Sequence, residues 1–520
     1  MYNAKSGKTK EGDAMRSVKL LWVIGPVLLF AVLGPSTIEM AEVSVAQPTL
    51  QSITVVVQVT DCVTQAPIQE AKVSILEKAT RKVLAQGLTD AEGRFSAVIL
   101  IIALNVPDAA ERIDVLVEKE GYTVQTSLIV VLSGPFGLFI SVSACLVRGA
   151  STAEPACSPI TATGPTLTVR PGQSLQQAIA QAAEGTVLQL EPGEYTIPTS
   201  LQITKGISLI GLGTKPDPND PAKTVPDPSA VILRGGRTEP VIVIQTEGKV
   251  LLGNVTVREG NGAGPTERGG GVHIENSKDV TLHCVILTEN IRFGLVALLS
   301  QVKIEESRIL KTQPATPGRD GHGLRIRGST VTVVKTLIRE NGAQGLAARD
   351  ADDEPSKVTV EESVIEGNVF SGLSVFDSSK LEVRKSRIAN NQPFEGQFGD
   401  GVFAGWFSEL VLEGTVIEGH RPRGQFSRSG VTLTEDVKAV LRGNQIRNND
   451  LGVVVGDANL PAETVKAEFF NNVFSNNDNC GLWIDADERI TIAGSGNRFE
   501  ERPGRAICGA TSKVPPGFGG

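Results

Sequence analysis

The chain has 520 residues, a formal net charge of -8 at pH 7 and a hydrophobic share of 40%. That share is enough for sizeable cores, and charged residues at 21% are too few for a disordered tail protein. Because phosphate contacts need clustered Lys and Arg, the acidic balance argues against nucleic-acid partners. The 55 glycines predict many turns between short elements.

The first 46 residues combine basic side chains with one apolar run, Leu20–Leu33. A run of this length is typical of an export signal and is shorter than the ~20 residues of a membrane-spanning helix. Ser44-Val45-Ala46 provides a small-x-small cleavage site. We predict that residues 1–46 direct export, with an uncleaved N-terminal anchor as the alternative and the only expected membrane contact. The folded part is expected to be secreted, periplasmic or on the cell surface.

Export places the six cysteines in an oxidising compartment, where disulfides form and persist. The simplest pairing joins Cys62 to Cys145 within one candidate domain and Cys480 to Cys508 near the C-terminus. The remaining two are Cys157, in a linker, and Cys284, in a repeat strand. Spacing alone does not decide the connectivity, so other pairings stay open.

Residues 50–148 carry short alternating runs separated by turn residues, which predict a small antiparallel β-sandwich. The predicted strands include Ile53–Val59, Ala71–Leu76 and Arg112–Glu118. Turn and strand positions of this region share a pattern at Asp61, Thr64, Pro67-Ile68, Ala71, Val73, Thr89-Asp90, Gly93, Phe95 and Gly121-Tyr122. With these residues the domain resembles the carboxypeptidase regulatory-like (prealbumin-type) domain, which implies an immunoglobulin-like accessory module without catalytic residues.

An uncharged, strongly apolar stretch covers residues 123–147 at the end of this domain. Ser133-Gly134-Pro135 interrupts it, so two buried strands joined by a turn are expected, with a transmembrane helix as the alternative. Residues 149–164, rich in Ser, Thr and Ala, are predicted to be a linker.

From residue 271 the chain repeats one phrase: Gly, then an aliphatic residue, any residue, and a small or aliphatic residue. The intervals run from 22 to 29 residues, which is typical of a solenoid with insertions. We assign the repeat domain to residues 165–510 and a C-terminal tail to residues 511–520. The marker glycines are Gly271, Gly294, Gly323, Gly345, Gly372, Gly401, Gly430, Gly452 and Gly481.

Each interval contains a short alternating strand, and Asn is frequent ten residues after that strand begins. Stacked coils would pair every strand with its neighbours and build one continuous core. The Asn column is predicted to be a structural ladder, because Asn tolerates left-handed turns and can bond to the next coil. Its members are Asn290, Asn341, Asn368, Asn391, Asn449 and Asn477, with Thr312 and His420 as exceptions.

The domain opens with a predicted amphipathic helix, Leu175–Ala183, capped by Ser174 and Gln177. This opening, with the glycine and Asn columns, resembles the right-handed parallel β-helix (pectin-lyase-like) superfamily. The predicted fold class is therefore all-β, with a β-helix of about 9–12 coils after the sandwich. That superfamily includes lyases, hydrolases, esterases, periplasmic accessory proteins and non-catalytic surface proteins, so the resemblance indicates a fold and not one function.

Outward positions lie two and four residues after each marker glycine. They carry three arginines on adjacent coils, followed by aromatic residues, and five aromatics fall within residues 394–407. Guanidinium groups can clamp carboxylates and aromatic faces can stack on sugar rings, which predicts a groove for an acidic polysaccharide. The alternative is that the aromatics pack inserted loops and the arginines pair with nearby acids. The predicted binding residues are Arg325, Arg327, Arg349, Phe376, Phe403 and Trp406.

Four acidic residues, Asp350, Asp352, Asp353 and Glu354, crowd one turn and are a candidate calcium site, the only cofactor expected. The alternative is a solvated turn. Gly321-His322-Gly323 resembles a polygalacturonase motif, but the paired carboxylates that hydrolysis needs are not found beside it. We therefore expect a non-catalytic glycan-binding or structural scaffold. The alternative is a polysaccharide lyase or glycoside hydrolase that uses the three arginines and the acidic turn.

Overall fold

The computed structural model describes most of the chain beyond residue 48. The described ranges are 49–61, 67–77, 82–103, 113–119, 122–134, 137–148, 155–217, 223–261, 269–315, 320–392, 399–421, 428–456 and 464–519. The predicted export signal and Cys62 lie outside them. Within these ranges no helix combines the length and hydropathy needed to cross a membrane.

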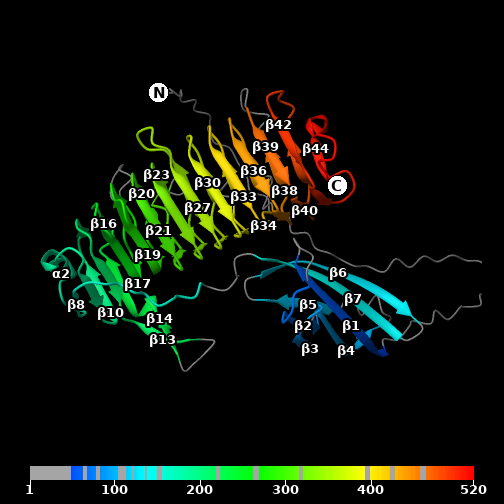
Figure 1. Ribbon diagram of the computed structural model, residues 1–520, viewed down its shortest axis with the longest axis horizontal. Helices are drawn as coiled ribbons and strands as arrows, with labels where there is room; N and C mark the ends of the chain where they lie inside the picture. Colours follow the sequence, from blue (N-terminus) through cyan, green and yellow to red (C-terminus); the bar gives the residue numbers. More distant parts are fainter. Residues whose placement is uncertain are drawn as a thin grey trace, which may run out of the picture. The chain divides into compact units, whose positions relative to one another are not determined.

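The N-terminal domain is a sandwich of two sheets, one with strand order β4-β1-β7-β6 and one with order β3-β2-β5 (Figure 1). Its pairs are antiparallel except β1 with β7, which run parallel, a departure from the predicted purely antiparallel pattern. The strands are β1 (Thr49–Asp61), β2 (Lys72–Glu77), β3 (Val83–Leu88), β4 (Arg94–Ala103), β5 (Ile113–Glu118), β6 (Tyr122–Gly134) and β7 (Gly137–Arg148).

Period-two alternation explains the core of this sandwich. On β1, Ile53, Val55, Val57 and Val59 all point inward and are fully buried. They pack with residues of both sheets in one cluster. The apolar stretch 123–147 forms β6 and β7, paired antiparallel from Tyr122 with Arg148 to Gly134 with Gly137, so the prediction of two strands is confirmed.

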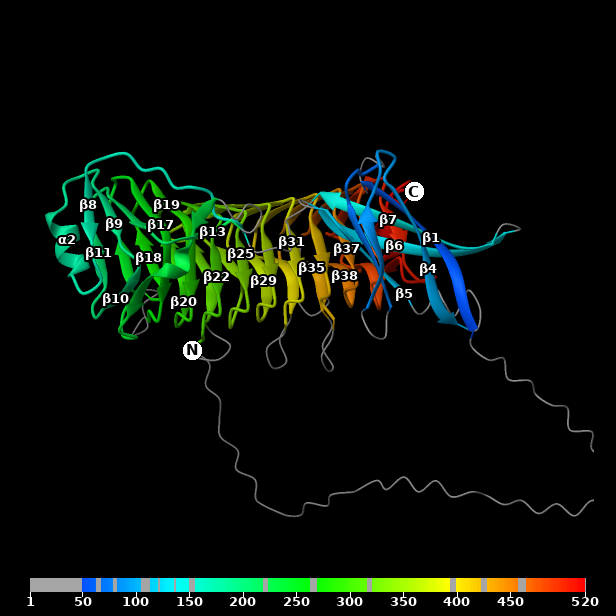
Figure 2. The same cartoon turned by 90° about the horizontal axis from the view of Figure 1, so that it is seen from below.

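The rest of the chain winds into stacked coils, and strands of successive coils lie side by side (Figures 1 and 2). One face is a parallel sheet of twelve strands, one for each coil. These strands are β11 (Leu201–Ile203), β16 (Ile242–Ile244), β18 (Val272–Glu275), β20 (Phe293–Leu298), β23 (His322–Arg327), β26 (Leu346–Arg349), β29 (Ser371–Val375), β32 (Asp400–Ala404), β35 (Ser429–Leu433), β38 (Leu451–Val455), β41 (Cys480–Ile484) and β44 (Ile507–Gly509).

The other faces belong to one 23-stranded sheet, continuous because two long strands turn a corner and pair with both rows. The first row is β8 (Thr166–Val169), β9 (Val187–Leu190), β12 (Ser208–Gly211), β17 (Val250–Arg258), β19 (Val280–Thr288), β21 (Gln301–Glu305), β24 (Thr330–Val334), β27 (Lys357–Glu361), β30 (Lys380–Arg384), β33 (Glu409–Glu413), β36 (Lys438–Arg442), β39 (Lys466–Phe470) and β42 (Thr491–Ser495). The second row is β10 (Gly193–Ile197), β15 (Val231–Gly235), β22 (Arg308–Leu310), β25 (Leu337–Arg339), β28 (Val364–Glu366), β31 (Arg387–Ala389), β34 (Val416–Glu418), β37 (Gln445–Arg447), β40 (Val473–Ser475) and β43 (Arg498–Glu500).

The marker glycines stand in single file at the start of the twelve-stranded sheet. Strand register places each one beside the next, as Leu324 opposite Leu346 and Leu346 opposite Leu373 show. A Cβ added at Gly345 would lie 2.6 Å from the carbonyl oxygen of Gly372 and 2.9 Å from Nδ2 of Asn368. The repeat requires glycine because the next coil and the Asn column both crowd this position.

The residues one and three after each glycine fill the interior, as alternation predicts. Leu324 and Ile326 are fully buried and belong to one cluster that runs from Val169 to Phe518. Because each coil buries its inner face only against its neighbours, the core is continuous along the stack.

The Asn column forms the predicted ladder. Asn341 donates from its backbone N and from Nδ2 to Oδ1 of Asn368, at 3.2 and 2.8 Å. Thr312 and His420 occupy the same column, since each donates its backbone N–H to the Oδ1 of the next Asn. A second ladder, not anticipated from the sequence, links Asn444, Asn472 and Asn497.

Both ends of the stack are covered. Helix α2 (Leu175–Gln181) begins at Ser174, whose hydroxyl accepts from the backbone N of Gln177, and buries Leu175 and Ile179. At the other end, residues 511–519 are not a separate tail, because Phe518 is 1% exposed and packs on Phe469 and Phe499. The remaining elements are the hairpin β13 (Thr214–Pro216) and β14 (Thr224–Pro226), with short helices η1 (Pro228–Ala230) and η2 (Thr511–Lys513).

Candidate functional site

Strand register brings the predicted binding residues together on the outer face of the twelve-stranded sheet, over β23, β26, β29 and β32. Arg327 lies opposite Arg349, and Ser374 lies opposite Phe403 on the next pair of coils. We call the set Arg325, Arg327, Arg349, Phe376, Phe403, Trp406 and Phe407 the Arg–aromatic cluster.

Arg349 is the centre of this cluster. Its guanidinium carbon lies 4.4 Å from the ring centroid of Phe376 and 5.1 Å from that of Trp406. Phe376 also contacts the rings of Phe403 and Trp406, with centroids 5.4 and 5.1 Å away. Such cation–π and aromatic contacts hold the side chains in a fixed arrangement.

Trp406 and Phe407 form an exposed aromatic turn after β32. Both have left-handed backbone angles, φ 54 and 65°, which large side chains adopt at a cost of roughly 1–3 kcal/mol each. They are 38% and 66% exposed, so burial does not compensate for that cost. The turns stacked on either side carry Asp377-Ser378 and Glu435-Asp436 at the same angles, side chains that suit such turns better.

The arginines are half-buried and already have some protein contacts. Arg327 donates from Nε to the carbonyl oxygen of Asp350 at 2.8 Å, and Nη1 of Arg349 lies 3.9 Å from Oδ2 of Asp377. Phe376 is only 6% exposed and supports the other rings from below. The alternative derived from the sequence, that aromatics pack each other and arginines meet acids, therefore describes part of the cluster.

His322 lies buried beside these arginines, with 8% of its surface exposed. Its ring stacks on Phe293 with centroids 5.9 Å apart. Burial, together with the positive charges of Arg325 and Arg349, lowers the pKa of His322 to about 3. The imidazole is therefore neutral at ordinary pH and acts as a packing residue.

The four acidic residues of the predicted calcium site lie on one short turn. Ala351 and Glu354 close a tight turn through backbone hydrogen bonds of 3.0 and 2.8 Å, which leaves Asp352, Asp353 and Glu354 exposed to solvent. In the part of the chain that the structure describes, no three His, Cys, Asp or Glu side chains are placed to hold a metal ion.

A buried acid on β32 was missed from the sequence. Asp400 is fully buried, and its Oδ1 accepts from the backbone N and Oγ of Ser429, while Oδ2 has no hydrogen-bond partner. Burial raises the pKa of Asp400 to about 6, against the opposing effects of Ser429, Thr432 and Arg428. One feature of the sequence could have indicated this buried acid: three successive coils carry a polar residue just before the marker glycine, Ser371, Asp400 and Ser429.

Two disulfides join described cysteines. Cys480 bonds to Cys508 between neighbouring strands, with Cα atoms 6.3 Å apart. Cys157 bonds to Cys284 across 127 residues, a pairing that the sequence left open.

The comparisons with known proteins point to one fold. The family described as "Right handed beta helix region" matches residues 239–384 and 322–499. The catalytic domain of a GH87 α-1,3-glucanase in complex with tetrasaccharides superposes with a TM-score of 0.51 at 10% identity, covering 91% of this chain and 88% of that one. No curated protein matches the chain by sequence.

Two more distant structures have TM-scores below 0.5. They are pectate lyase Pel9A (0.35, 12% identity, covering 71% of this chain and 82% of that one) and PfbA, a surface adhesin of Streptococcus pneumoniae (0.43, 11% identity, covering 64% and 88%). At these identities the likeness concerns the fold alone. Because the family match extends over residues 239–499, half of the chain, the protein belongs to the right-handed β-helix family.

Proposed function

We propose that this protein binds an acidic polysaccharide through the Arg–aromatic cluster. The observation that carries the proposal is the exposed aromatic turn, Trp406 and Phe407, held in left-handed angles beside Arg349. Folding alone gives no reason to place two large rings in solvent at a position where neighbouring coils carry Asp, Ser and Glu. Strain of this kind often marks a binding site.

The spacing of the coils suits a polymeric ligand that runs along the stack. Paired strands repeat every ~4.8 Å, so Arg327 and Arg349 present two guanidinium groups about one sugar residue apart. Phe376 and Trp406 follow on the next two coils. A chain with a carboxylate on successive sugars would meet arginines first and aromatic rings next.

The rest of the proposal concerns where the protein works. We infer an exported protein, secreted, periplasmic or on the cell surface, in which the N-terminal sandwich is a prealbumin-type accessory module. Disulfides between described cysteines support an oxidising compartment. The α-1,3-glucanase of similar fold was solved in complex with tetrasaccharides. This agrees with the proposal that the present chain binds a glycan, but it specifies no substrate for it.

A polysaccharide lyase or glycoside hydrolase is the second candidate, and one observation favours it. The raised pKa of Asp400, about 6, is suited to a general acid. Its complete burial and the solvent exposure of the 352–354 carboxylates argue for the binding function first.

The experiment measures retention of the protein on immobilised uronate polysaccharides, together with release of new reducing or unsaturated ends. Trp406→Ala is expected to weaken retention about 2- to 10-fold, since an aromatic contact contributes roughly 0.5–1.5 kcal/mol. Phe470→Ala is the matched control, because Phe470 also stacks with an arginine, Arg442 at 5.5 Å, but on the 23-stranded sheet.

Three results separate the candidates. Retention that depends on Trp406 but not on Phe470 supports binding. New chain ends that disappear in Arg325→Ala or Asp400→Asn would establish the enzyme instead. A protein that neither holds nor cleaves any polysaccharide of a broad panel ends both proposals.

A further inference from the structure

Residues 155–163 lie along the outside of the 23-stranded sheet instead of hanging free as a linker. Cys157 is joined to Cys284, in the middle of β19. Ile160 packs over β17, because a Cβ added at Gly253 would lie 2.8 Å from its Cδ1 atom. We call residues 155–163 the strap.

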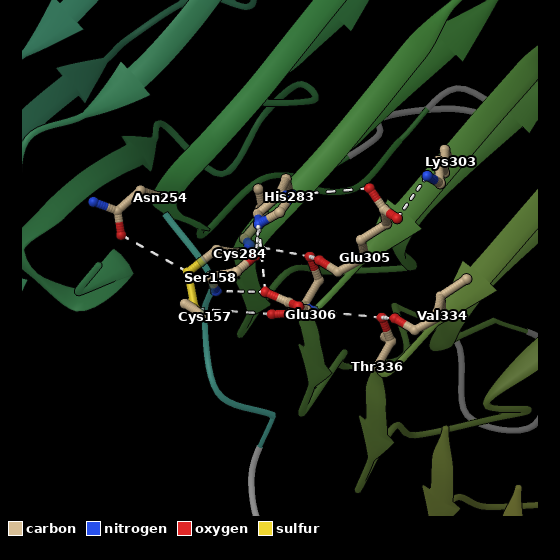
Figure 3. Close-up of polar contacts among 12 residues, drawn as sticks. Cys157, Ser158, Asn254, His283, Cys284, Lys303, Glu305, Glu306, Val334 and Thr336 are labelled. Carbon is tan, nitrogen blue, oxygen red and sulfur yellow. Dashed lines mark hydrogen bonds and ion pairs between the residues drawn. A yellow bond between two sulfur atoms is a disulfide. The ribbon is translucent and has the colours of Figure 1, made fainter. Parts of the chain in front are cut away.

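Polar contacts reinforce the covalent bond (Figure 3). The backbone N of Ser158 donates to Oε2 of Glu306 at 2.5 Å, and its hydroxyl lies 3.1 Å from Nε2 of His283. Glu305 lies 3.8 Å from the other ring nitrogen of His283 and is paired with Lys303 at 2.6 Å. Side chains from two neighbouring coils therefore hold the strap at one point.

The Ser158–His283–Glu305 arrangement does not suit acyl transfer. Oε2 of Glu306 lies 3.4 Å from the same Nε2 atom that faces the serine hydroxyl. A carboxylate at this place would repel the oxyanion that forms when a serine attacks a carbonyl. The contacts are better explained as a fastening of the strap.

The strap changes where the chain leaves the β-helix. After the strap, β8 pairs with β9 at the first coil, whereas Ser158 contacts Glu306, which directly follows β21. The pairings β8–β9, β9–β12, β12–β17, β17–β19 and β19–β21 separate these points by five steps of ~4.8 Å, or roughly 24 Å. The strap therefore runs back along the stack over these coils.

We propose that the Cys157–Cys284 disulfide converts the predicted linker into a covalent strap that moves the exit point of the chain from the first coil to the coil of β21. That coil neighbours the one that carries Arg325 and Arg327, since β21 pairs with β24. The chain segment that leads to the N-terminal sandwich is therefore fastened to the wall one coil before the start of the Arg–aromatic cluster. Oxidation of the two thiols removes two electrons and two protons, which a disulfide oxidant of the export compartment accepts.

The test compares the full chain with its Cys157→Ser/Cys284→Ser variant. Peptide mapping without reductant is expected to recover Cys157 linked to Cys284. The backbone amide of Ser158, which donates to Glu306, is expected to exchange hydrogen at least about tenfold faster in the variant. Small-angle scattering is expected to show a larger radius of gyration, because the nine residues of the strap, once released from the wall, add up to ~30 Å of tether.

The matched control is Cys480→Ser/Cys508→Ser, which removes the other disulfide and is expected to leave exchange in the strap unchanged. If the strap variant does not fold, as judged by circular dichroism, mild reduction and alkylation of the folded protein provides the same comparison. Unchanged exchange at Ser158, or Cys157 linked to a different cysteine, overturns the proposal whatever the scattering shows.

Discussion

His420 keeps the hydrogen-bond ladder intact but makes the stability of the fold sensitive to acid. It replaces Asn in the ladder, with Nδ1 2.8 Å from Oδ1 of Asn449 and Nε2 3.1 Å from Nδ2 of Asn391. The carboxamide oxygen requires a proton on Nδ1, and the amide of Asn391 requires a bare Nε2. The ladder therefore accepts only the neutral imidazole.

Acid should unfold the protein partly through this residue. Burial lowers the pKa of His420 to about 4, despite the opposing effects of Asn449 and Glu418. The unfolded chain takes up a proton near pH 6.5 and the folded chain only near pH 4. Stability is therefore lost as the pH falls through this window, by roughly 3 kcal/mol.

We expect His420→Asn to reduce that loss, because Asn fills the same column on neighbouring coils. The free energy of unfolding from urea denaturation at pH 7 and at pH 4.5 provides the measurement. The variant should gain stability over the parent as the pH falls. Equal pH dependence in the two proteins would show that His420 is not responsible.

At the scale of the strand, the short strands of the second row carry charges that alternate in sign along the stack. Arg387 donates to Glu366 and Glu418 at 2.8 Å each, and Arg447 meets Glu418 at 2.8 Å. The side chains of Arg387, Glu418 and Arg447 are 8–16% exposed. Burial opposes ionisation of Glu418, but Arg447 and Arg387 outweigh it and hold its pKa below the usual value.

We expect Glu418→Gln to destabilise the fold by roughly 3 kcal/mol, since it leaves two buried guanidinium groups without their shared anion. Glu413→Gln is the matched control, because its partner Arg384 lies 3.4 Å away at an exposed site, and its loss should cost at most about 1 kcal/mol. Urea denaturation at pH 7 compares the two.

The stabilisation by Glu418 also depends on pH. Because folding lowers the pKa of Glu418, its contribution to the free energy of unfolding is fully present above the pKa of the unfolded chain. That contribution is lost as the pH falls through the pKa of the folded protein. The difference in the free energy of unfolding between the parent and Glu418→Gln should therefore become smaller in acid. A gap that widens in acid, or equal losses for the two variants at pH 7, would contradict this account.

For the molecule as a whole, a stack of coils is vulnerable at its ends, where the core is covered from one side only. Phe518 covers the C-terminal end and packs edge-on against Phe469, with ring centroids 5.7 Å apart. The backbone oxygen of Phe518 also accepts from Nδ2 of Asn497, which terminates the second ladder.

We expect Phe518→Ala to cost roughly 3–5 kcal/mol, as for other buried aromatic truncations. Hydrogen exchange should increase first in β42 and β43, the strands of the last coil in this sheet, because fraying begins at the uncovered end. Exchange that increases uniformly over all coils would show that the stack unfolds as one unit and that this residue is not a cap.

The β-helix could be predicted because its rules are local and repeated. Alternation around Gly345 sets which side chains face inward, and the neighbour that each strand needs is the next copy of the same phrase. The Asn ladder was predictable for the same reason, and so was the alignment of Arg327 with Arg349.

What only the tertiary structure decided depends on segments that break the repeat. Cys157 of the strap reaches Cys284 because the segment before the first coil lies along the outside of the 23-stranded sheet. Asp400 is buried at the start of β32, where Ser429 of the next coil donates to it. A backbone bridge between Ala351 and Glu354 closes the acidic turn and leaves Asp352, Asp353 and Glu354 in solvent. Periodic sequence determines which residues stack, whereas contacts between non-repeating segments depend on paths in space that no period encodes.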